Sequence, residues 1–120
     1  MSAIKPTGIK RLIKACGYSW QGLMFSWRNE TAFQQESAAL VVMLPFALWW
    51  PSTKIESAML IMSLFIVLIT ELLNTGIEAA INRHGDEQHH WSGVAKDVAS
   101  AAVLLALLQC ALVWSLVLFF

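Results

Sequence analysis

One run of polar residues, Glu71-Leu-Leu-Asn74-Thr-Gly-Ile-Glu78, interrupts a segment that is otherwise apolar and long enough to cross a bilayer. The segment covers residues 57–81, and a membrane-spanning helix needs about 20 residues at a rise of about 1.5 Å each. A charged side chain near the centre of such a helix costs about 2.5–3.5 kcal/mol on insertion scales, so its presence indicates a function. At about 100° per residue, positions 71 and 78 lie about 20° apart around the helix, and Asn74 lies beside them. The sequence therefore predicts a polar stripe on one face of an intramembrane helix.

The composition favours a membrane protein. Hydrophobic residues make up 58% of the 120 positions and charged residues 13%, against about 45–50% and about 25% in a soluble globular chain. A soluble domain of this length could not cover so much apolar surface. We therefore expect a single all-α membrane domain over residues 1–120.

The chain divides into one amphipathic segment and three apolar ones. In residues 8–29, apolar positions recur at helical spacing opposite basic ones, and aromatic residues suited to the headgroup zone follow. This pattern predicts a helix on the membrane surface. The predicted transmembrane helices are residues 31–50, 57–81 and 98–120, with a polar loop over 82–93.

The distribution of basic residues predicts the orientation. Five of the eight Lys and Arg residues precede the first span, two flank the loop between the second and third spans, and only Lys54 lies in the opposite loop. Because basic residues accumulate in cytoplasmic loops, we expect the N-terminus to be cytoplasmic and the C-terminus to be outside. Nearly all polar residues then lie on the cytoplasmic side.

Glu30 and Glu36 enter the first span on that side and can face the carboxylates of the polar stripe. Carboxylates in a protein-lined niche suit Mg²⁺, whose ligands are often completed by phosphates of a substrate. Lys96, beside Asp97 at the start of the third span, offers a cation for phosphate, and one intramembrane carboxylate could act as a base. Metal ligand, phosphate clamp and base are the parts that phosphoryl transfer requires.

Simpler interpretations exist for most of these residues. Glu30 and Glu36 are compatible with solvated helix caps, the Lys96-Asp97 pair with an ordinary ion pair, and the loop histidines with a polar loop. A carboxylate ladder also occurs in non-catalytic proton- or ion-handling membrane subunits. A proton relay, however, needs no cytoplasmic phosphate clamp, so Lys96 and Asp97 favour a kinase.

These residues resemble a known family, the small prokaryotic diacylglycerol kinases, which are integral-membrane enzymes and include undecaprenol kinases. The resemblance covers essentially the whole chain. It rests first on Glu71-x-x-Asn74-x-x-Ile77-Glu78, which matches the family signature ExxNxxIE. Further matches are Arg11 and residues 15–20, 29–30, 33–36 and 92–101.

The resemblance implies a role for each matching residue. Glu71 would be the general base, Glu30 and Glu78 would hold the Mg²⁺ that accompanies ATP, and Lys96 would neutralise the phosphates. The implied nucleotide site adds Arg11, Tyr18, Glu87, His89 and Asp97 to these. The implied lipid site comprises Glu71 together with Arg11, Ala15, Tyr18, Trp20, Gln35, Glu36, Asn74 and Ser100. The resemblance also implies a homotrimer whose sites lie at subunit interfaces.

The sequence departs from the family pattern at two positions. Asn82 replaces an Asp that usually follows the signature, and Met24 replaces a basic residue of the enterobacterial type. The resemblance favours ATP-dependent phosphorylation of diacylglycerol to phosphatidic acid at the cytoplasmic face of a bacterial inner membrane. Phosphorylation of undecaprenol is the alternative within the same class of enzyme.

Overall fold

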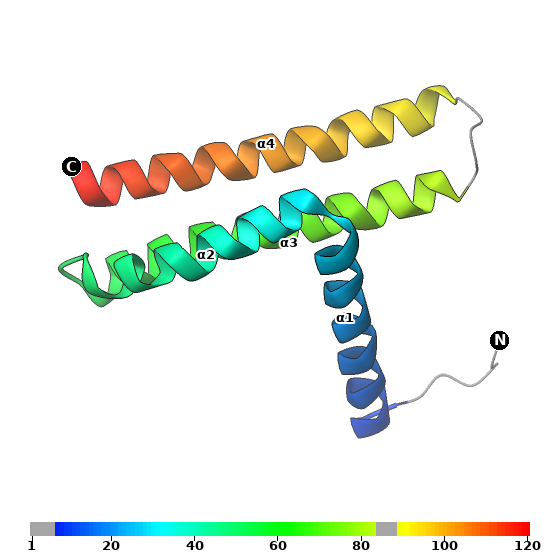
Figure 1. Cartoon of the computed structure of the whole chain (residues 1–120), viewed down its shortest axis with the longest axis horizontal. Helices are drawn as coiled ribbons and strands as arrows, with labels where there is room; N and C mark the ends of the chain where they lie inside the picture. Colours follow the sequence, from blue (N-terminus) through cyan, green and yellow to red (C-terminus); the bar gives the residue numbers. More distant parts are fainter. Residues whose placement is uncertain (1–6, 84–88) are drawn as a thin grey trace.

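The computed structural model describes residues 7–83 and 89–120, and all of their regular structure is helical. The helices are α1 (Ile9–Asn29), α2 (Thr31–Trp49), α3 (Lys54–Asn82) and α4 (His90–Phe119). Helices α2 and α4 both pack along α3, and α1 projects crosswise from the three (Figure 1). The prediction of an all-α fold is confirmed.

Glu30 makes the corner between α1 and α2. Its backbone is extended (φ −115°, ψ 107°), so it serves as the C-cap of α1 and the N-cap of α2 at once. Its N–H still donates to the carbonyl of Ser26 at 2.9 Å, and the side chain of Gln34 donates back to the carbonyl of Trp27. A single extended residue therefore turns the chain and keeps Glu30 beside both helices.

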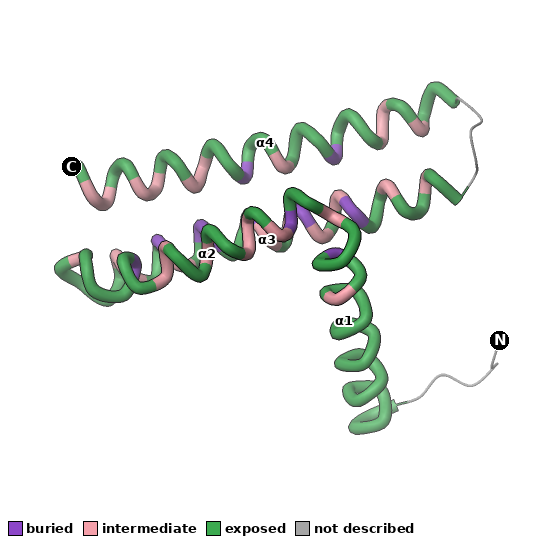
Figure 2. Tube along the Cα trace, viewed as in Figure 1, coloured by how far each residue is buried: buried purple, intermediate pink, exposed green. Residues whose placement is uncertain are grey.

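The core is a narrow stripe of α3 residues. Leu60, Leu64 and Val67 are buried, and steps of three and four residues place them on one face of the helix. Helix α4 meets α3 through Ala99 and Ala106, whose small side chains permit a close approach. Most of the other described residues are exposed in the single chain (Figure 2).

Two of the described helices, α3 and α4, are long and apolar enough to cross a membrane. They contain 29 and 30 residues, which corresponds to about 43–45 Å at about 1.5 Å per residue. Both therefore exceed the hydrocarbon thickness of about 30 Å. Helix α2, with 19 residues, does not meet the same criteria.

Helices α3 and α4 begin earlier than the predicted spans. The side chain of Thr53 accepts a hydrogen bond from the N–H of Glu56 at 3.1 Å and caps α3. In the same way, Nδ1 of His89 accepts from the N–H of Trp91 at 3.2 Å and caps α4. Part of the predicted loop 82–93 is therefore the first turn of α4. Lys96 lies in the second turn, beyond the range in which a helix N-terminus favours anions.

Candidate functional site

Glu71 lies on α3 within electrostatic range of three other carboxylates, those of Glu30, Glu36 and Glu78. Glu71 is 5% exposed in the middle of α3, and the negative charges of Glu30 and Glu78 act on it. The charge of Glu71 acts in turn on Glu36, which is half-buried on α2. Within one chain, Glu30 and Glu36 therefore lie close enough to the α3 stripe for their charges to interact with that of Glu71.

Buried oxygen atoms around Glu71 lack hydrogen-bond partners. Among the side chains that the structure describes, the buried unpartnered atoms are Oε1 of Glu36, Oδ1 of Asn74 and Oγ1 of Thr75. The amide nitrogen of Asn74 is occupied, because it donates to Oε1 of Glu78 at 3.3 Å. Buried polar groups are normally paired, so this group of acceptors is suited to a ligand that donates hydrogen bonds, such as an alcohol.

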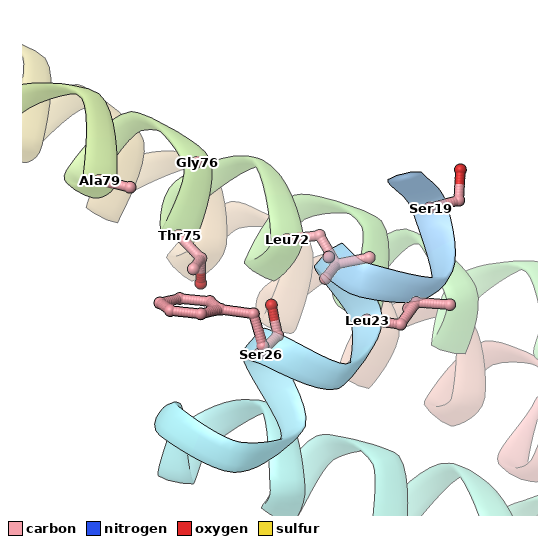
Figure 3. A pocket seen from close by; sticks show the side chains of 9 residues that line it. Ser19, Leu23, Ser26, Leu72, Thr75, Gly76 and Ala79 are labelled. Atoms are coloured by element: carbon pink, nitrogen blue, oxygen red, sulfur yellow. The ribbon is translucent and has the colours of Figure 1, made fainter. Parts of the chain in front are cut away.

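A cleft of about 480 Å³ opens between α1 and α3, one turn beyond Glu71. Thr75 and Gly76 of α3 line it from one side, and Gly22 and Ser26 of α1 line it from the other. Figure 3 shows the hydroxyls of Thr75 and Ser26 pointing toward one another across this space. A β-carbon added at Gly22 or Gly76 would meet no atom within 4 Å. The cleft is mostly apolar, and its lining includes the hydroxyl residues Ser19, Ser26 and Thr75. An uncharged lipid with a polar head would match that lining.

A second, more polar cleft of about 480 Å³ lies at the start of α4. His89, His90, Gly93 and Asp97 line it. Two of the predicted nucleotide residues, His89 and Asp97, are therefore neighbours. Lys96 is exposed beside them, on a different helix from the buried carboxylates.

The structure brings together only part of the predicted site. By the carboxylate group we mean the four residues Glu30, Glu36, Glu71 and Glu78. Asn74 adjoins this group through its hydrogen bond to Glu78. The other described candidates are exposed on the single chain, namely Arg11, Ala15, Tyr18, Trp20, Gln35, His89, Lys96, Asp97 and Ser100. Glu87 lies outside the described residues.

Glu30 and Glu78 have the chemistry that Mg²⁺ requires. Both are half-buried and act on the same carboxylate, Glu71. No cluster of three or more His, Cys, Asp or Glu ligands occurs in residues 7–83 and 89–120. Mg²⁺ is commonly held by one or two carboxylates, with waters and substrate phosphates completing its shell, so two carboxylates fit this mode of binding.

The sequence did not lead us to predict the α1 side of the cleft between α1 and α3. Ser26 is 3% exposed, and it follows Gly22 by one helical turn on the face that meets α3. The available signal was the recurrence of small residues, Ser19, Gly22 and Ser26, at spacings of three and four residues on one face of this helix. Gly76, inside the ExxNxxIE signature, is the matching signal on α3.

Comparison with known proteins identifies the family. The family described as prokaryotic diacylglycerol kinase matches residues 17–118. The chain belongs to the prokaryotic diacylglycerol kinase family. This result confirms the resemblance inferred from the ExxNxxIE signature.

Named diacylglycerol kinases are similar to the chain over nearly their whole length. The diacylglycerol kinase of Escherichia coli K12 is 46% identical over 112 residues, which cover 93% of this chain and 92% of that protein. The Haemophilus influenzae diacylglycerol kinase is 41% identical over 116 residues, covering 97% and 98%. The one from Pseudomonas aeruginosa is 39% identical over 112 residues, covering 93% and 91%. The residues that the family matches, 17–118, include the carboxylate group, the cleft between α1 and α3 and the cleft at the start of α4.

Proposed function

We propose that the chain transfers the γ-phosphoryl group of ATP to the free hydroxyl of diacylglycerol and so produces phosphatidic acid and ADP. The observation that carries the proposal is Glu71, a carboxylate that is 5% exposed in a membrane-length helix and adjoins buried, unpartnered acceptors. The family membership and the names of the relatives support the same reaction. They favour the kinase over a proton-handling subunit and diacylglycerol over undecaprenol.

In this proposal Glu71 is the general base. The lipid hydroxyl lies against Glu71, its proton passes to the carboxylate, and its oxygen forms the new bond to the γ-phosphorus. The bond between that phosphorus and the β–γ bridging oxygen breaks, and ADP leaves with the electron pair. Glu36 and Asn74 hold the alcohol, because each has a buried oxygen free to accept a hydrogen bond.

The lipid enters through the cleft between α1 and α3. Its acyl chains meet the apolar lining from Leu23 and Leu72, and the glyceryl oxygens meet the hydroxyls of Ser26 and Thr75. Thr75 follows Glu71 by one turn on the same face, so the head of a lipid in the cleft reaches the base at the membrane interface. Ala15 and Trp20 are exposed nearer the start of α1, and in this proposal they contact the outer part of the lipid.

Glu30 and Glu78 would hold Mg²⁺ together with the ATP phosphates. The ion would supply positive charge against the developing charge of the phosphoryl group. Asn74 orients Glu78 by its 3.3 Å hydrogen bond. The corner at Glu30 keeps the other ligand at the junction of α1 and α2.

The nucleotide site is completed by another protomer of a homotrimer. Lys96, Asp97 and His89 are exposed on α4, whereas the base faces α2. A groove of about 490 Å³ between α3 and α4, which Asn74 also lines, gives a neighbouring protomer access to the carboxylate group. This arrangement also covers part of the apolar surface that the single chain exposes.

The three helices α2, α3 and α4 span the bacterial inner membrane, with α1 on its cytoplasmic surface. Helix α2 contacts α3, and the axes of the two helices are nearly aligned in Figure 1. Its 19 residues reach about 28 Å at about 1.5 Å per residue, close to the hydrocarbon thickness of about 30 Å. The excess of basic residues before α2 and around residues 82–97 supports a cytoplasmic N-terminus.

The test is a substrate panel with purified protein in mixed micelles and radiolabelled ATP. We expect label in phosphatidic acid when diacylglycerol is supplied, and at least tenfold less with undecaprenol. Glu71→Gln should be inactive in this assay, and its matched control is Glu56→Gln. Glu56 is a carboxylate at the other end of α3, and its contact is the cap residue Thr53. Transfer to undecaprenol alone, or to no lipid alcohol in the panel, would contradict the proposal.

A further inference from the structure

A second polar cluster joins α3 to α4, away from the carboxylates, and the proposed reaction does not use it. At its centre Ser63, 2% exposed, accepts a hydrogen bond from Nε1 of Trp114 at 3.1 Å. Nε2 of Gln109 donates to the backbone carbonyl of Ser63 at 2.9 Å, and Sγ of Cys110 lies 3.6 Å from its hydroxyl oxygen. We call these four residues the Ser63 cluster.

Hydrogen bonds are directional and apolar contacts are not, and the surroundings of Ser63 are apolar. The buried neighbours of Ser63 along α3 are Leu60, Leu64 and Val67. In a bilayer, lipid tails are as apolar as leucine, so apolar side chains alone provide little preference for one rotation of a helix over another. Hydrogen bonds in this region also lack competition from water. The Ser63 cluster therefore fixes both the rotation and the axial register of α3 on α4.

Helical geometry connects this cluster to the base. Glu71 follows Ser63 by eight residues, which corresponds to about 12 Å along the axis and about 80° around it. Ser63 faces α4 through its hydrogen bonds, and Glu71 interacts with Glu36 on α2. A rotation of α3 that released Ser63 from α4 would turn Glu71 by the same angle, away from its position facing α2.

We propose that Ser63 is a positioning residue, which aims Glu71 at the lipid hydroxyl by locking α3 onto α4 through Trp114 and Gln109. The inference rests on the proposed phosphoryl transfer. It predicts that the cluster acts on the rate of transfer and not on nucleotide binding, because none of its members lies near the His89–Asp97 cleft.

The first experiment removes single hydrogen bonds. Trp114→Phe keeps an aromatic ring but loses the donor, and Ser63→Ala loses the acceptor. Matched controls are Trp49→Phe, an exposed tryptophan, and Ser115→Ala, whose exposed hydroxyl bonds the carbonyl of Ala111 in its own helix at 2.7 Å. We expect kcat to fall about tenfold in the two cluster variants, since small misplacements of reacting groups cost up to about a hundredfold. KM for MgATP and both controls should stay within about twofold of the parent. Unchanged kcat in Trp114→Phe and Ser63→Ala would overturn the proposal.

The second experiment replaces the hydrogen bonds by a covalent bond. In a Cys16→Ser background, Ser63→Cys brings a second thiol next to Cys110. Diamide then accepts two electrons and two protons from the two thiols and leaves a disulfide between α3 and α4. We expect mass spectrometry to show the bond within one chain, kcat to be reduced before oxidation, and kcat to return to within about twofold of the background after it.

This rescue separates positioning from general stabilisation. If the cluster only stabilised the fold, the disulfide would raise the midpoint of thermal unfolding while kcat stayed at its reduced value, and the proposal would be wrong. Failure of the disulfide to form would also overturn it, because the register of α3 on α4 would differ from the one described. The disulfide is measured without substrate, so absence of kinase activity in the unmodified chain would refute the proposed function separately.

Discussion

Replacement of Glu71 by glutamine is the most direct test of the chemistry. Glutamine preserves the size and shape of the side chain and removes only the ability to accept a proton. A positioned general base contributes about 10²–10⁴ in rate, which equals about 3–5.5 kcal/mol of transition-state stabilisation at about 1.4 kcal/mol per factor of ten. We therefore expect phosphoryl transfer to fall by about 10²–10⁴ in Glu71→Gln.

The same change should leave the fold intact or stabilise it. Glu71 is buried and interacts with the charges of Glu30, Glu36 and Glu78, so removal of its charge relieves repulsion inside the protein. Insertion scales give a cost of about 2.5–3.5 kcal/mol for a charge at the centre of a membrane helix. The midpoint of thermal unfolding in detergent should then be equal to or above that of the parent.

Rapid-quench measurement of a single turnover, with saturating diacylglycerol, isolates the chemical step. Glu71→Asp is an informative companion, because it keeps the carboxylate but withdraws it by one methylene, and an intermediate rate is expected. Glu56→Gln controls for loss of a carboxylate elsewhere on α3. Turnover within about tenfold of the parent in a well-folded Glu71→Gln protein would refute the assignment of the base.

Three other predictions test the remaining parts of the site. Replacing each proposed magnesium ligand, Glu30 or Glu78, by glutamine should move the midpoint of Mg²⁺ activation to a higher concentration at fixed ATP, and unchanged midpoints in both variants would contradict the metal assignment. Gly76→Leu fills the cleft between α1 and α3 and should raise KM for diacylglycerol, whereas Gly93→Leu fills the cleft at the start of α4 and should raise KM for ATP; the reverse pattern would exchange the two sites. Subunits that lack the catalytic base, mixed with Lys96→Leu subunits under conditions of exchange, should recover a fraction of the activity. With exchange verified by crosslinking, no recovery would place both residues in one chain's site.

The polar stripe and the all-helical fold could be predicted because they depend on local periodicity. Glu71, Asn74 and Glu78 recur at spacings of three and four residues in one helix, and no tertiary information is needed to place them on one face. The corner at Glu30 was predictable for a similar reason, since the polar segment 28–30 separates an amphipathic pattern from an apolar one.

The start of α4 and the Ser63 cluster could not be predicted in this way. His89 caps α4 through Nδ1, but in the sequence a histidine in a polar segment is typical of a loop. The first turn of α4 was therefore assigned to the loop. Ser63 and Trp114 are 51 residues apart, and their contact depends on the register of two helices that are both apolar. Gln109 was the available signal, because an amide in a membrane-length helix needs a partner.

The positions of the cleft between α1 and α3 and of the groove between α3 and α4 support the proposal that a second protomer completes the site. Ala79 of α3 lines the cleft toward α1, and Ile77 lines the groove toward α4. These positions are about 200° apart around the helix axis, so the two openings face nearly opposite sides of α3. Glu71 lies between them and faces α2. In the proposed reaction, a lipid in the first opening would approach Glu71 from one side and the phosphate groups would approach it from the other. The exposed Lys96 and Asp97 of the same chain lie on α4 and not over α2, so a neighbouring protomer is the simplest source of the phosphate clamp, and the subunit-mixing experiment measures that contribution directly.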